Sequence, residues 1–303
     1  MKISYIMIVL NGMPFIQASL KSIYESAYEI FIIEGNEEKA AFAATSDGFS
    51  TDGTTKFIKL FPDPDKKIKI INQSPLKKYQ RRGPPLRQGV INGKKYGWID
   101  KCAMQNQAVK KATGDYIWLV DSDEVYKEED INVIIQMLDK DPSIYQIDVP
   151  CIHFWKGYNW ILDSKISVRQ KASRIFKNQQ PCYFSTHRPP TMYYCNLRRK
   201  SIHLKIIDAD ILKSQGVCFY HYSYVLNKQV WQKANLYKEY GWEKPWNMDL
   251  KDWYENCFMK WTAENREEIE KKYTIIPCAP KSKTKLFTGT HPIAMKDIIK
   301  GTK

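Results

Sequence analysis

The chain has 303 residues, of which 43% are hydrophobic and 26% are charged, and this composition argues against disorder. Its longest apolar stretches, near residues 6–10 and 30–33, are far shorter than the roughly 20 residues that a membrane-spanning helix needs. The formal net charge of +14 favours an anionic partner, such as nucleic acid, an anionic membrane surface or a phosphate-bearing small molecule.

Strand and helix signals alternate along the first half of the chain. Apolar, β-branched runs predict strands, and helical spacing of apolar residues predicts the helices between them. The predicted strands are 3–10, 28–33, 67–72, 116–120 and 145–152. One predicted helix begins at Pro14, a second ends near 57–61, and two more cover 99–112 and 128–139. This alternation predicts an α/β protein with a mostly parallel central sheet flanked by helices.

The second half has a different pattern. Residues 151–225 are rich in aromatic side chains and short β-like runs, which indicates antiparallel pieces, and residues 228–272 are strongly helical. We therefore expect three parts: an α/β half of the nucleotide-binding kind at 1–150, an acceptor-side β-rich region of the same domain at 151–225, and a helical C-terminal extension at 226–303.

The cysteines and the N-terminus bear on the compartment. Seven cysteines are scattered without a CxxC pair, which predicts reduced thiols and argues against a zinc site and a disulfide scaffold. No small-residue cleavage site follows the apolar residues near the N-terminus, so we interpret them as a first strand. These features predict a cytoplasmic protein. Basic clusters at 77–87 and 198–205 are compatible with peripheral contact at the inner surface of an anionic membrane.

Polar side chains follow three of the predicted strands where each strand ends. Asn11 follows the first strand, Glu34 the second, and Asp121 and Asp123 the strand at 116–120. Because parallel strands bring their carboxyl ends to one edge of a sheet, and ligands bind beyond that edge in open α/β sheets, these residues predict a site.

Asp121 and Asp123 are two residues apart, so both point to the same side of an extended chain. Two carboxylates placed in this way can hold a hard divalent cation through oxygen. The alternative for an isolated pair is a solvated loop or a helix N-cap. The preceding apolar strand and the matching strand ends favour the metal interpretation.

Three segments together resemble a known family. These are VLNGMPFIQASLKSIYESAYEIFIIEG at 9–35, the turn STDGT at 50–54, and GDYIWLVDSDE at 114–124. They resemble the opening strand–helix–strand, the S-x-D-G-T turn and the DxD segment of family-2-type glycosyltransferases with the GT-A fold. The resemblance spans residues 3–150, about half of the chain.

The resemblance implies inverting transfer of a sugar from a nucleotide-diphosphate sugar to a glycan or lipid-linked acceptor, with Mn²⁺ or Mg²⁺ at the diphosphate. It implies that Asp123 is a direct metal ligand and that Asp121 faces the ribose and the metal. The other residues that it places at the donor are Leu10, Asn11, Glu34, Asp52, Lys101 and Ser122. In this chain residues 36–49 separate the acid at position 34 from the turn that contains Asp52, whereas the family has them close together.

Three residues of the second half are further candidates. His221 matches the C-terminal histidine with which related enzymes bind the metal or diphosphate, and an imidazole suits Mn²⁺; the alternative is a histidine satisfied within an aromatic strand. Many members of the family have a catalytic acid after an R-x-x-F-like strand, where this chain has SRIFK at 173–177 and then STHRPPT. His187 is therefore the first candidate for the catalytic base and Asp163 the second, and a turn histidine is the alternative for His187.

Two other functions fit parts of the sequence less well. A nucleotidyltransferase on a related sheet needs a glycine-rich loop with a basic residue after the first strand, and LNGMPF has one glycine and no basic residue. A nucleic-acid-binding protein agrees with the net charge, but no helix-turn-helix, RRM or zinc pattern occurs. We therefore expect no nucleic-acid partner.

Overall fold

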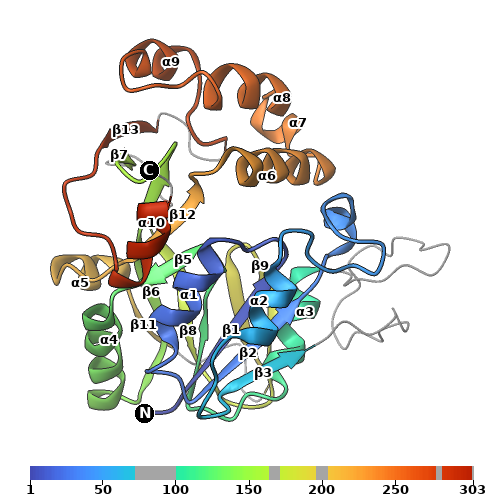
Figure 1. Ribbon diagram of the computed structural model, residues 1–303. Helices are drawn as coiled ribbons and strands as arrows, with labels where there is room; N and C mark the ends of the chain where they lie inside the picture. The colour runs from blue at the N-terminus through green and yellow to red at the C-terminus, as the bar shows by residue number, and fades with distance from the viewer. Residues whose placement is uncertain (72–99, 164–170, 196–203, 278–281, 302–303) are drawn as a thin grey trace.

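The computed structural model describes residues 1–71, 100–163, 171–195, 204–277 and 282–301. Its main sheet has eleven strands among these residues, in the order β13-β7-β6-β8-β4-β1-β2-β3, with β11 and β12 also beside β6 and β5 beside β12 (Figure 1). Its strands are β1 Ile3–Val9, β2 Glu29–Glu34, β3 Ile68–Ile71, β4 Tyr116–Leu119, β5 Glu124–Tyr126, β6 Ile144–Trp155, β7 Trp160–Asp163, β8 Lys171–Lys177, β11 Lys205–Ile207, β12 Phe219–Tyr224 and β13 Lys283–Leu286.

Helices connect and cover these strands, and a separate hairpin is formed by β9 Cys182–His187 and β10 Pro190–Tyr194. The α-helices are α1 Phe15–Ile23, α2 Thr54–Leu60, α3 Lys101–Val109, α4 Glu128–Lys140, α5 Ala209–Ser214, α6 Asn227–Glu239, α7 Glu243–Trp246, α8 Leu250–Asp252, α9 Arg266–Lys272 and α10 Lys296–Gly301. The segments η1 Glu38–Ala43 and η3 Ile293–Met295 are 3₁₀ helices, and η2 Trp253–Phe258 is a π-helix.

The first half is the parallel α/β unit that the apolar runs predict. β1 pairs in parallel with β2 and with β4, and β2 pairs in parallel with β3. Every residue of β2 and β4 is buried, which explains why these strands have no polar alternation. Because Val9 lies opposite Glu34 in the register, β1 and β2 end at the same edge of the sheet.

The remaining strands turn the sheet into a mixed one. β8 is antiparallel to β4 and to β6, whereas β12 runs parallel to β6 and antiparallel to β5. In this register His221 of β12 lies opposite Glu124 of β5 and His153 of β6. The expected α/β fold class is confirmed, and β12 brings a residue of the late chain next to the acids that follow β4.

The helices α6 to α9 lie over the edge of the sheet at which β1 ends (Figure 1). Trp253 and Trp261 are buried there in one apolar cluster with Trp155 of β6. Trp231 does not pack in this way, since 48% of it is exposed. The chain then returns to the sheet, where β13 pairs with β7.

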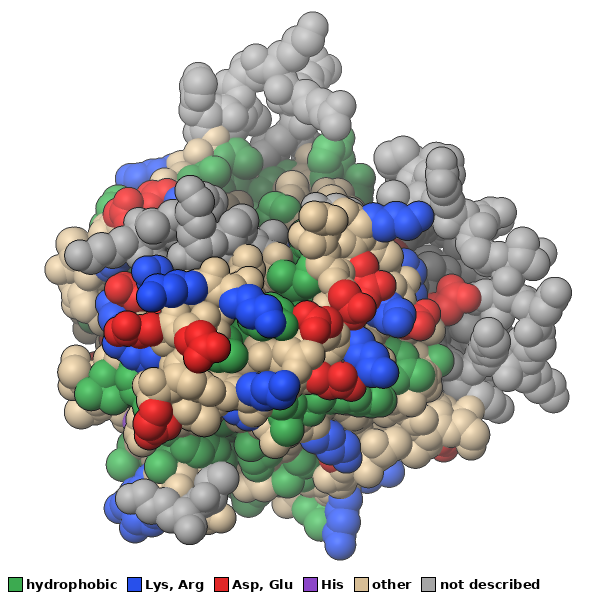
Figure 2. Space-filling view, turned by 90° about the horizontal axis from the view of Figure 1, so that it is seen from above, with side chains coloured by type: hydrophobic (Ala, Val, Ile, Leu, Met, Phe, Trp, Pro, Cys, Tyr) green, Lys and Arg blue, Asp and Glu red, His purple; other side chains and the backbone are tan. Residues whose placement is uncertain are grey.

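The surface of the described residues is mixed in charge. Figure 2 shows basic and acidic side chains interspersed on the face seen from above. The basic cluster at 77–87 and most of the one at 198–205 lie outside the described residues. Among the residues that the structure describes, no helix is long and apolar enough to cross a membrane.

Candidate active site

A cleft with a cavity volume of about 200 Å³ opens at the edge where β1, β2 and β4 end. Its walls come from the β1–α1 connection, η1, the segment after β4, the end of β9, β12 and α6. The sequence-predicted residues that line it are Leu10, Asn11, Lys101, Asp121, Ser122, Asp123, His187 and His221. Segments separated by up to about two hundred positions in the sequence therefore meet in one cavity.

Glu34 and Asp52, both expected at the donor, do not line the cleft. Glu34 is buried and accepts hydrogen bonds from the backbone N–H of Ser50 (3.3 Å) and from the Thr55 hydroxyl. Asp52 accepts a hydrogen bond from the backbone N–H of Met13 (2.9 Å). The two carboxylates tie the turn before α2 to β2 and to the β1–α1 connection, so both have a scaffolding position in this structure.

Asn11 lines the cleft, but its side chain holds the wall together. Its side-chain amide donates to the carbonyl of Ala43 (2.7 Å), and its Oδ1 accepts from the backbone N–H of Thr51 (2.7 Å). Asn11 has a positive φ of 57°, a conformation that asparagine tolerates better than most residues. The long segment at 36–49 is thereby fastened to the end of β1.

Asp163, the second candidate for the catalytic base, lies elsewhere. It is the last residue of β7, and its Oδ1 is 3.1 Å from Nζ of Lys285 on the neighbouring strand β13. It does not line the cleft, so the structure does not place it where an acceptor hydroxyl would react.

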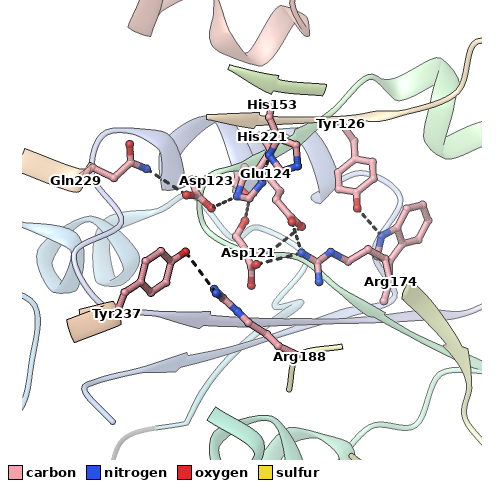
Figure 3. A network of polar contacts seen from close by, with 12 residues as sticks. Asp121, Asp123, Glu124, Tyr126, His153, Arg174, Arg188, His221, Gln229 and Tyr237 are labelled. Atoms are coloured by element: carbon pink, nitrogen blue, oxygen red, sulfur yellow. Dashed lines mark hydrogen bonds and ion pairs between the residues drawn. The ribbon is translucent and has the colours of Figure 1, made fainter. Parts of the chain in front are cut away.

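The acids after β4 lie in a turn, which differs from the extended chain expected there. The backbone N–H of Glu124 donates to the carbonyl of Asp121 (3.0 Å), and Asp121 and Asp123 both reach the cleft. Arg174 of β8 lies behind them, with Nη2 3.1 Å from Asp121 Oδ2 and also in contact with Glu124 (Figure 3). Glu124 is fully buried as the first residue of β5, where its carboxylate contacts Arg174 and accepts a hydrogen bond from the backbone N–H of Asp121 (3.1 Å).

Burial and Arg174 set the charges of this group. Burial raises the pKa of Glu124 to about 7, although the positive charge of Arg174 opposes that shift. Burial acts in the same direction on Asp121, but there the charges of Arg174 and of the nearby histidines prevail and the pKa is lowered. Asp121 is therefore ionised at neutral pH.

Asp123 faces His221 and Gln229. Its Oδ1 lies 3.3 Å from Nε2 of His221, and its Oδ2 accepts a hydrogen bond from the Gln229 side chain of α6 (3.1 Å; Figure 3). Burial alone would raise the pKa of Asp123, but His221 outweighs it and the pKa is lowered. His221 is only partly buried and lines the cleft, so it is not merely a histidine satisfied within an aromatic strand.

This donor set fits a divalent cation. Asp123 offers carboxylate oxygen, His221 offers imidazole nitrogen from the same side, and the carboxylate of Asp121 lines the same cavity. Imidazole together with carboxylate suits Mn²⁺, and carboxylate oxygen suits both Mn²⁺ and Mg²⁺.

The opposite side of the cleft is positively charged. Lys101, at the first turn of α3, is 3.8 Å from Glu37, and burial and the neighbouring Arg188 lower its pKa. Arg188 follows β9, and its Nη1 is 3.5 Å from the hydroxyl of Tyr237 on α6. Lys101 and Arg188 bring two positive charges to this side of the cleft, so it is suited to an anionic ligand.

His187 ends β9 between these two sides. Burial lowers its pKa well below the ordinary value, and the charge of Lys101 acts in the same direction. Its Nδ1 has no hydrogen-bond partner among the described residues. The imidazole is therefore neutral at pH 7 and able to accept a proton.

Several residues of the site were not predicted from the sequence. Gln229 and His153 lie in segments whose patterns indicate only a helix and a strand, and Glu37 lies in the segment 36–49, for which no role was predicted. Arg188 had a signal, because it directly follows the histidine chosen as a candidate base. Arg174 also had a signal, because it is a charged residue within the predicted strand SRIFK at 173–177.

One family model matches the middle of the chain. Residues 90–206 match the family model described as glycosyl transferase family 2, a range that contains Asp121, Asp123, Arg174 and His187. This part of the chain is therefore similar to glycosyl transferase family 2. The resemblance to family-2-type enzymes with the GT-A fold is confirmed by this match, although the segments at 9–35 and 50–54 lie outside the matched range. The comparison with curated proteins found no match.

Solved structures of glycosyltransferases are also similar to the chain. A mannosyltransferase from Pyrobaculum calidifontis, in complex with GDP-Man and Mn²⁺, is 20% identical over 49% of this chain and 35% of its own, with a TM-score of 0.32. TarS 1-349 of S. aureus is 13% identical over 89% of this chain and 78% of its own, with a TM-score of 0.39. Glucosyl-3-phosphoglycerate synthase from Mycobacterium tuberculosis, with Mn²⁺ and UDP, is 15% identical over 50% and 44%, with a TM-score of 0.30. The chain thus spans about a third of the mannosyltransferase, and TM-scores this low add nothing to the family match.

Proposed function

We propose that the cleft binds a nucleotide-diphosphate sugar and transfers its sugar to a glycan or lipid-linked acceptor, with Mn²⁺ or Mg²⁺ and with inversion at the anomeric carbon. The observation that carries this proposal is the convergence of Asp123 and His221, 3.3 Å apart, across the cleft from Lys101 and Arg188. A cavity with a cation-binding side and a positively charged side suits a diphosphate that is bound together with a metal.

The acids and His221 form the first side of the proposed site. Asp123 and His221 would hold the divalent ion, and Asp121 would contribute its carboxylate beside them. The bound ion would neutralise charge on the diphosphate leaving group. Arg174 keeps Asp121 ionised and in place through its contact of 3.1 Å.

Lys101 and Arg188 form the second side. Lys101 is partly buried, whereas Arg188 is exposed and presents planar N–H donors that suit phosphate oxygen. Tyr237 contacts the guanidinium, which keeps it directed along the wall formed by α6. We assign to these cations the binding of the diphosphate, together with backbone contacts from Leu10, Asn11 and Ser122.

His187 is our candidate for the catalytic base. A neutral imidazole in this position takes the proton of the acceptor hydroxyl as that oxygen attacks the anomeric carbon, a contribution of roughly 10²–10⁴ in rate. Since the pKa of His187 lies well below its ordinary value of 6.5, the rate should not decline as the pH falls from 8 to 6.5. A decline in that range would contradict this role.

The proposal includes a cytoplasmic enzyme in peripheral contact with an anionic membrane, because a lipid-linked acceptor has to be reached there. Its motivation is the net charge of +14 and the basic clusters, which lie largely outside the described residues. Co-sedimentation with vesicles that contain anionic lipid, at low salt, is expected. Failure to co-sediment would remove the membrane contact from the proposal and leave the donor site untouched.

The release of nucleoside diphosphate tests the proposed reaction. Purified chain is incubated with UDP-, GDP-, CDP- and dTDP-sugars, with Mn²⁺ or with a chelator. We expect release from one donor class with Mn²⁺ and a loss of at least about 100-fold in Asp123→Ala. Asp163→Asn, an acid outside the cleft, is the matched control and should stay within about twofold of wild type. Full activity in Asp123→Ala would overturn the metal site.

A further inference from the structure

Cys151, His153 and His221 lie side by side on adjacent strands. Cys151 and His153 are two residues apart on β6, so their side chains emerge on the same side of that strand. β12 runs parallel to β6 with His221 opposite His153. One ligand atom of each of the three residues lies within 4.8 Å of the other two. Figure 3 shows the ring of His153 against that of His221.

We propose that Cys151, His153 and His221 form a second metal site, selective for a thiophilic divalent ion such as Zn²⁺, and that its occupancy blocks the binding of Mn²⁺ at Asp123. The blocking of Mn²⁺ rests on the proposed function, since His221 is shared by the two sites. Thiolate sulfur together with imidazole selects Zn²⁺ over Mg²⁺ and Mn²⁺, whereas the carboxylates in the cleft have the opposite preference.

The distances suit this ion. Zn–N bonds of about 2.0–2.1 Å in tetrahedral geometry place two ligand nitrogens about 3.3 Å apart. The Nδ1 atoms of His153 and His221 are 3.1 Å apart. A Zn–S bond of about 2.3 Å places the sulfur about 3.6 Å from each nitrogen. One ligand atom of each of the three residues already lies within 4.8 Å of the others, so a small approach of the side chains completes this geometry.

Binding of the metal at this site displaces one proton. Cys151 releases its thiol proton to solvent as the sulfur–metal bond forms. Each imidazole donates its Nδ1 lone pair to the metal and keeps its proton on Nε2. For His221 this N–H points to Asp123 Oδ1, 3.3 Å away, which accepts the hydrogen bond. A carboxylate behind a metal-bound histidine is the usual way in which the ring is oriented.

The same proton makes the two sites exclude one another. To bind a metal beside Asp123, His221 must offer the lone pair of Nε2 and carry its proton on Nδ1, where His153 accepts it. To bind a metal beside Cys151, His221 must offer Nδ1 and carry the proton on Nε2. A neutral imidazole has one N–H, so it serves one metal at a time.

Cobalt spectroscopy tests the site without any assay of activity. One equivalent of Co²⁺ added to the reduced, full-length chain is expected to give a thiolate-to-cobalt charge-transfer band and the visible bands of tetrahedral cobalt. Cys151→Ser should lose the charge-transfer band, whereas Cys257→Ser, which alters a buried cysteine outside the cluster, should retain it. His153→Asn, which keeps the thiol, should weaken the binding of Co²⁺ by at least about tenfold. Circular dichroism shows that each variant is folded. No charge-transfer band in wild type, or an unchanged band in Cys151→Ser, overturns the proposal.

The competition with Mn²⁺ is measured separately. Electron paramagnetic resonance of free Mn²⁺ is expected to show binding weakened by at least about tenfold when wild type is first loaded with one equivalent of Zn²⁺, and no such effect in Cys151→Ser. Equal Mn²⁺ affinity with and without Zn²⁺ refutes the competition. Asp123→Asn should lose Mn²⁺ binding and keep the cobalt–thiolate band, because its amide oxygen still accepts from His221. If wild type gives the cobalt band but binds no Mn²⁺, the metal site of the proposed function fails and the Cys151 site stands.

Discussion

Arg174 is the residue whose removal should affect the site most strongly. It is 8% exposed and contacts both Asp121 and Glu124, which are themselves partly or fully buried. In Arg174→Met a chain of similar length keeps the packing against Phe219 but leaves two carboxylates without their cation. Removing one partner of a buried ion pair costs about 3–5 kcal/mol, which is a large part of the stability of a typical domain.

The pH dependence of this cost has a definite sign. Burial already raises the pKa of Glu124 to about 7, and Arg174 is the main cause that opposes the shift. Without Arg174 the folded-state pKa moves further above the unfolded value. A group with a raised folded-state pKa contributes stability that is present below the unfolded pKa and is lost as the pH rises through the folded pKa. The loss in the free energy of unfolding of Arg174→Met, relative to wild type, should therefore be largest above about pH 8 and become smaller toward pH 5.

Urea unfolding near pH 5.5 and near pH 8.5 measures the size of the destabilisation and its dependence on pH. Lys251→Met is the control, because it removes a cation from an exposed pair, with Glu255 at 3.9 Å, that is worth about 0–1 kcal/mol at either pH. Adding Glu124→Gln to Arg174→Met should recover part of the loss at the higher pH. An Arg174→Met variant as stable as wild type at pH 8.5, or equally destabilised at both pH values, would refute the reasoning.

Three further predictions concern the cleft. His187→Asn should lower kcat by about 100-fold and leave the donor KM within about threefold, and steady-state kinetics that show only a raised KM would contradict its role as base. Arg188→Gln should weaken the binding of a nucleoside diphosphate by about tenfold in calorimetry, whereas unchanged affinity would exclude Arg188 from the diphosphate site. Gly12→Ala should lower the free energy of unfolding, measured in urea, by about 1–3 kcal/mol, because a Cβ there would lie 2.7 Å from Val9 Cγ2 and 3.1 Å from Ser122. An unchanged free energy of unfolding would show that the β1–α1 connection can shift to accommodate the added methyl group.

The sequence allowed the parallel half of the sheet to be predicted almost residue by residue. β1, β2 and β4 are continuous apolar runs because both faces are covered, and such runs are recognisable without knowledge of their neighbours. Asp121 and Asp123 were found for the same reason, since a strand of this kind has a definite carboxyl end. The positions of these two acids in the cleft thus follow from local information.

Residues whose place depends on side-chain direction were harder to predict. Glu34 follows a strand end as Asp121 does, but its carboxylate turns to Ser50 and Thr55 and leaves the cleft. Which way it turns depends on Ser50 and on Thr55 at the start of α2, and nothing within β2 encodes the positions of these two residues. Asp163 was chosen by position in the chain, and only the pairing of β7 with β13 shows that its partner is Lys285.

Contacts between distant strands were beyond prediction. Arg174 meets Glu124 only because β8 crosses beside β4, and Cys151 meets His221 only because β12 pairs with β6 in one particular register. The scattered cysteines without a CxxC pair argued against a zinc site, but spacing in the sequence reports only on ligands from one local segment. Ligands from two strands have no such spacing.

The central claim is that a divalent metal and a nucleotide diphosphate meet between Asp123 and the cations of the cleft. The most direct measurement is an anomalous difference map at the manganese edge, from crystals soaked with Mn²⁺ and with the nucleoside diphosphate that raises the melting temperature most. We predict a manganese peak in contact with Asp123 and His221, and the diphosphate between that peak and the side chains of Lys101 and Arg188. A nucleotide bound outside this cleft, or a manganese peak that touches neither Asp123 nor His221, would contradict the account.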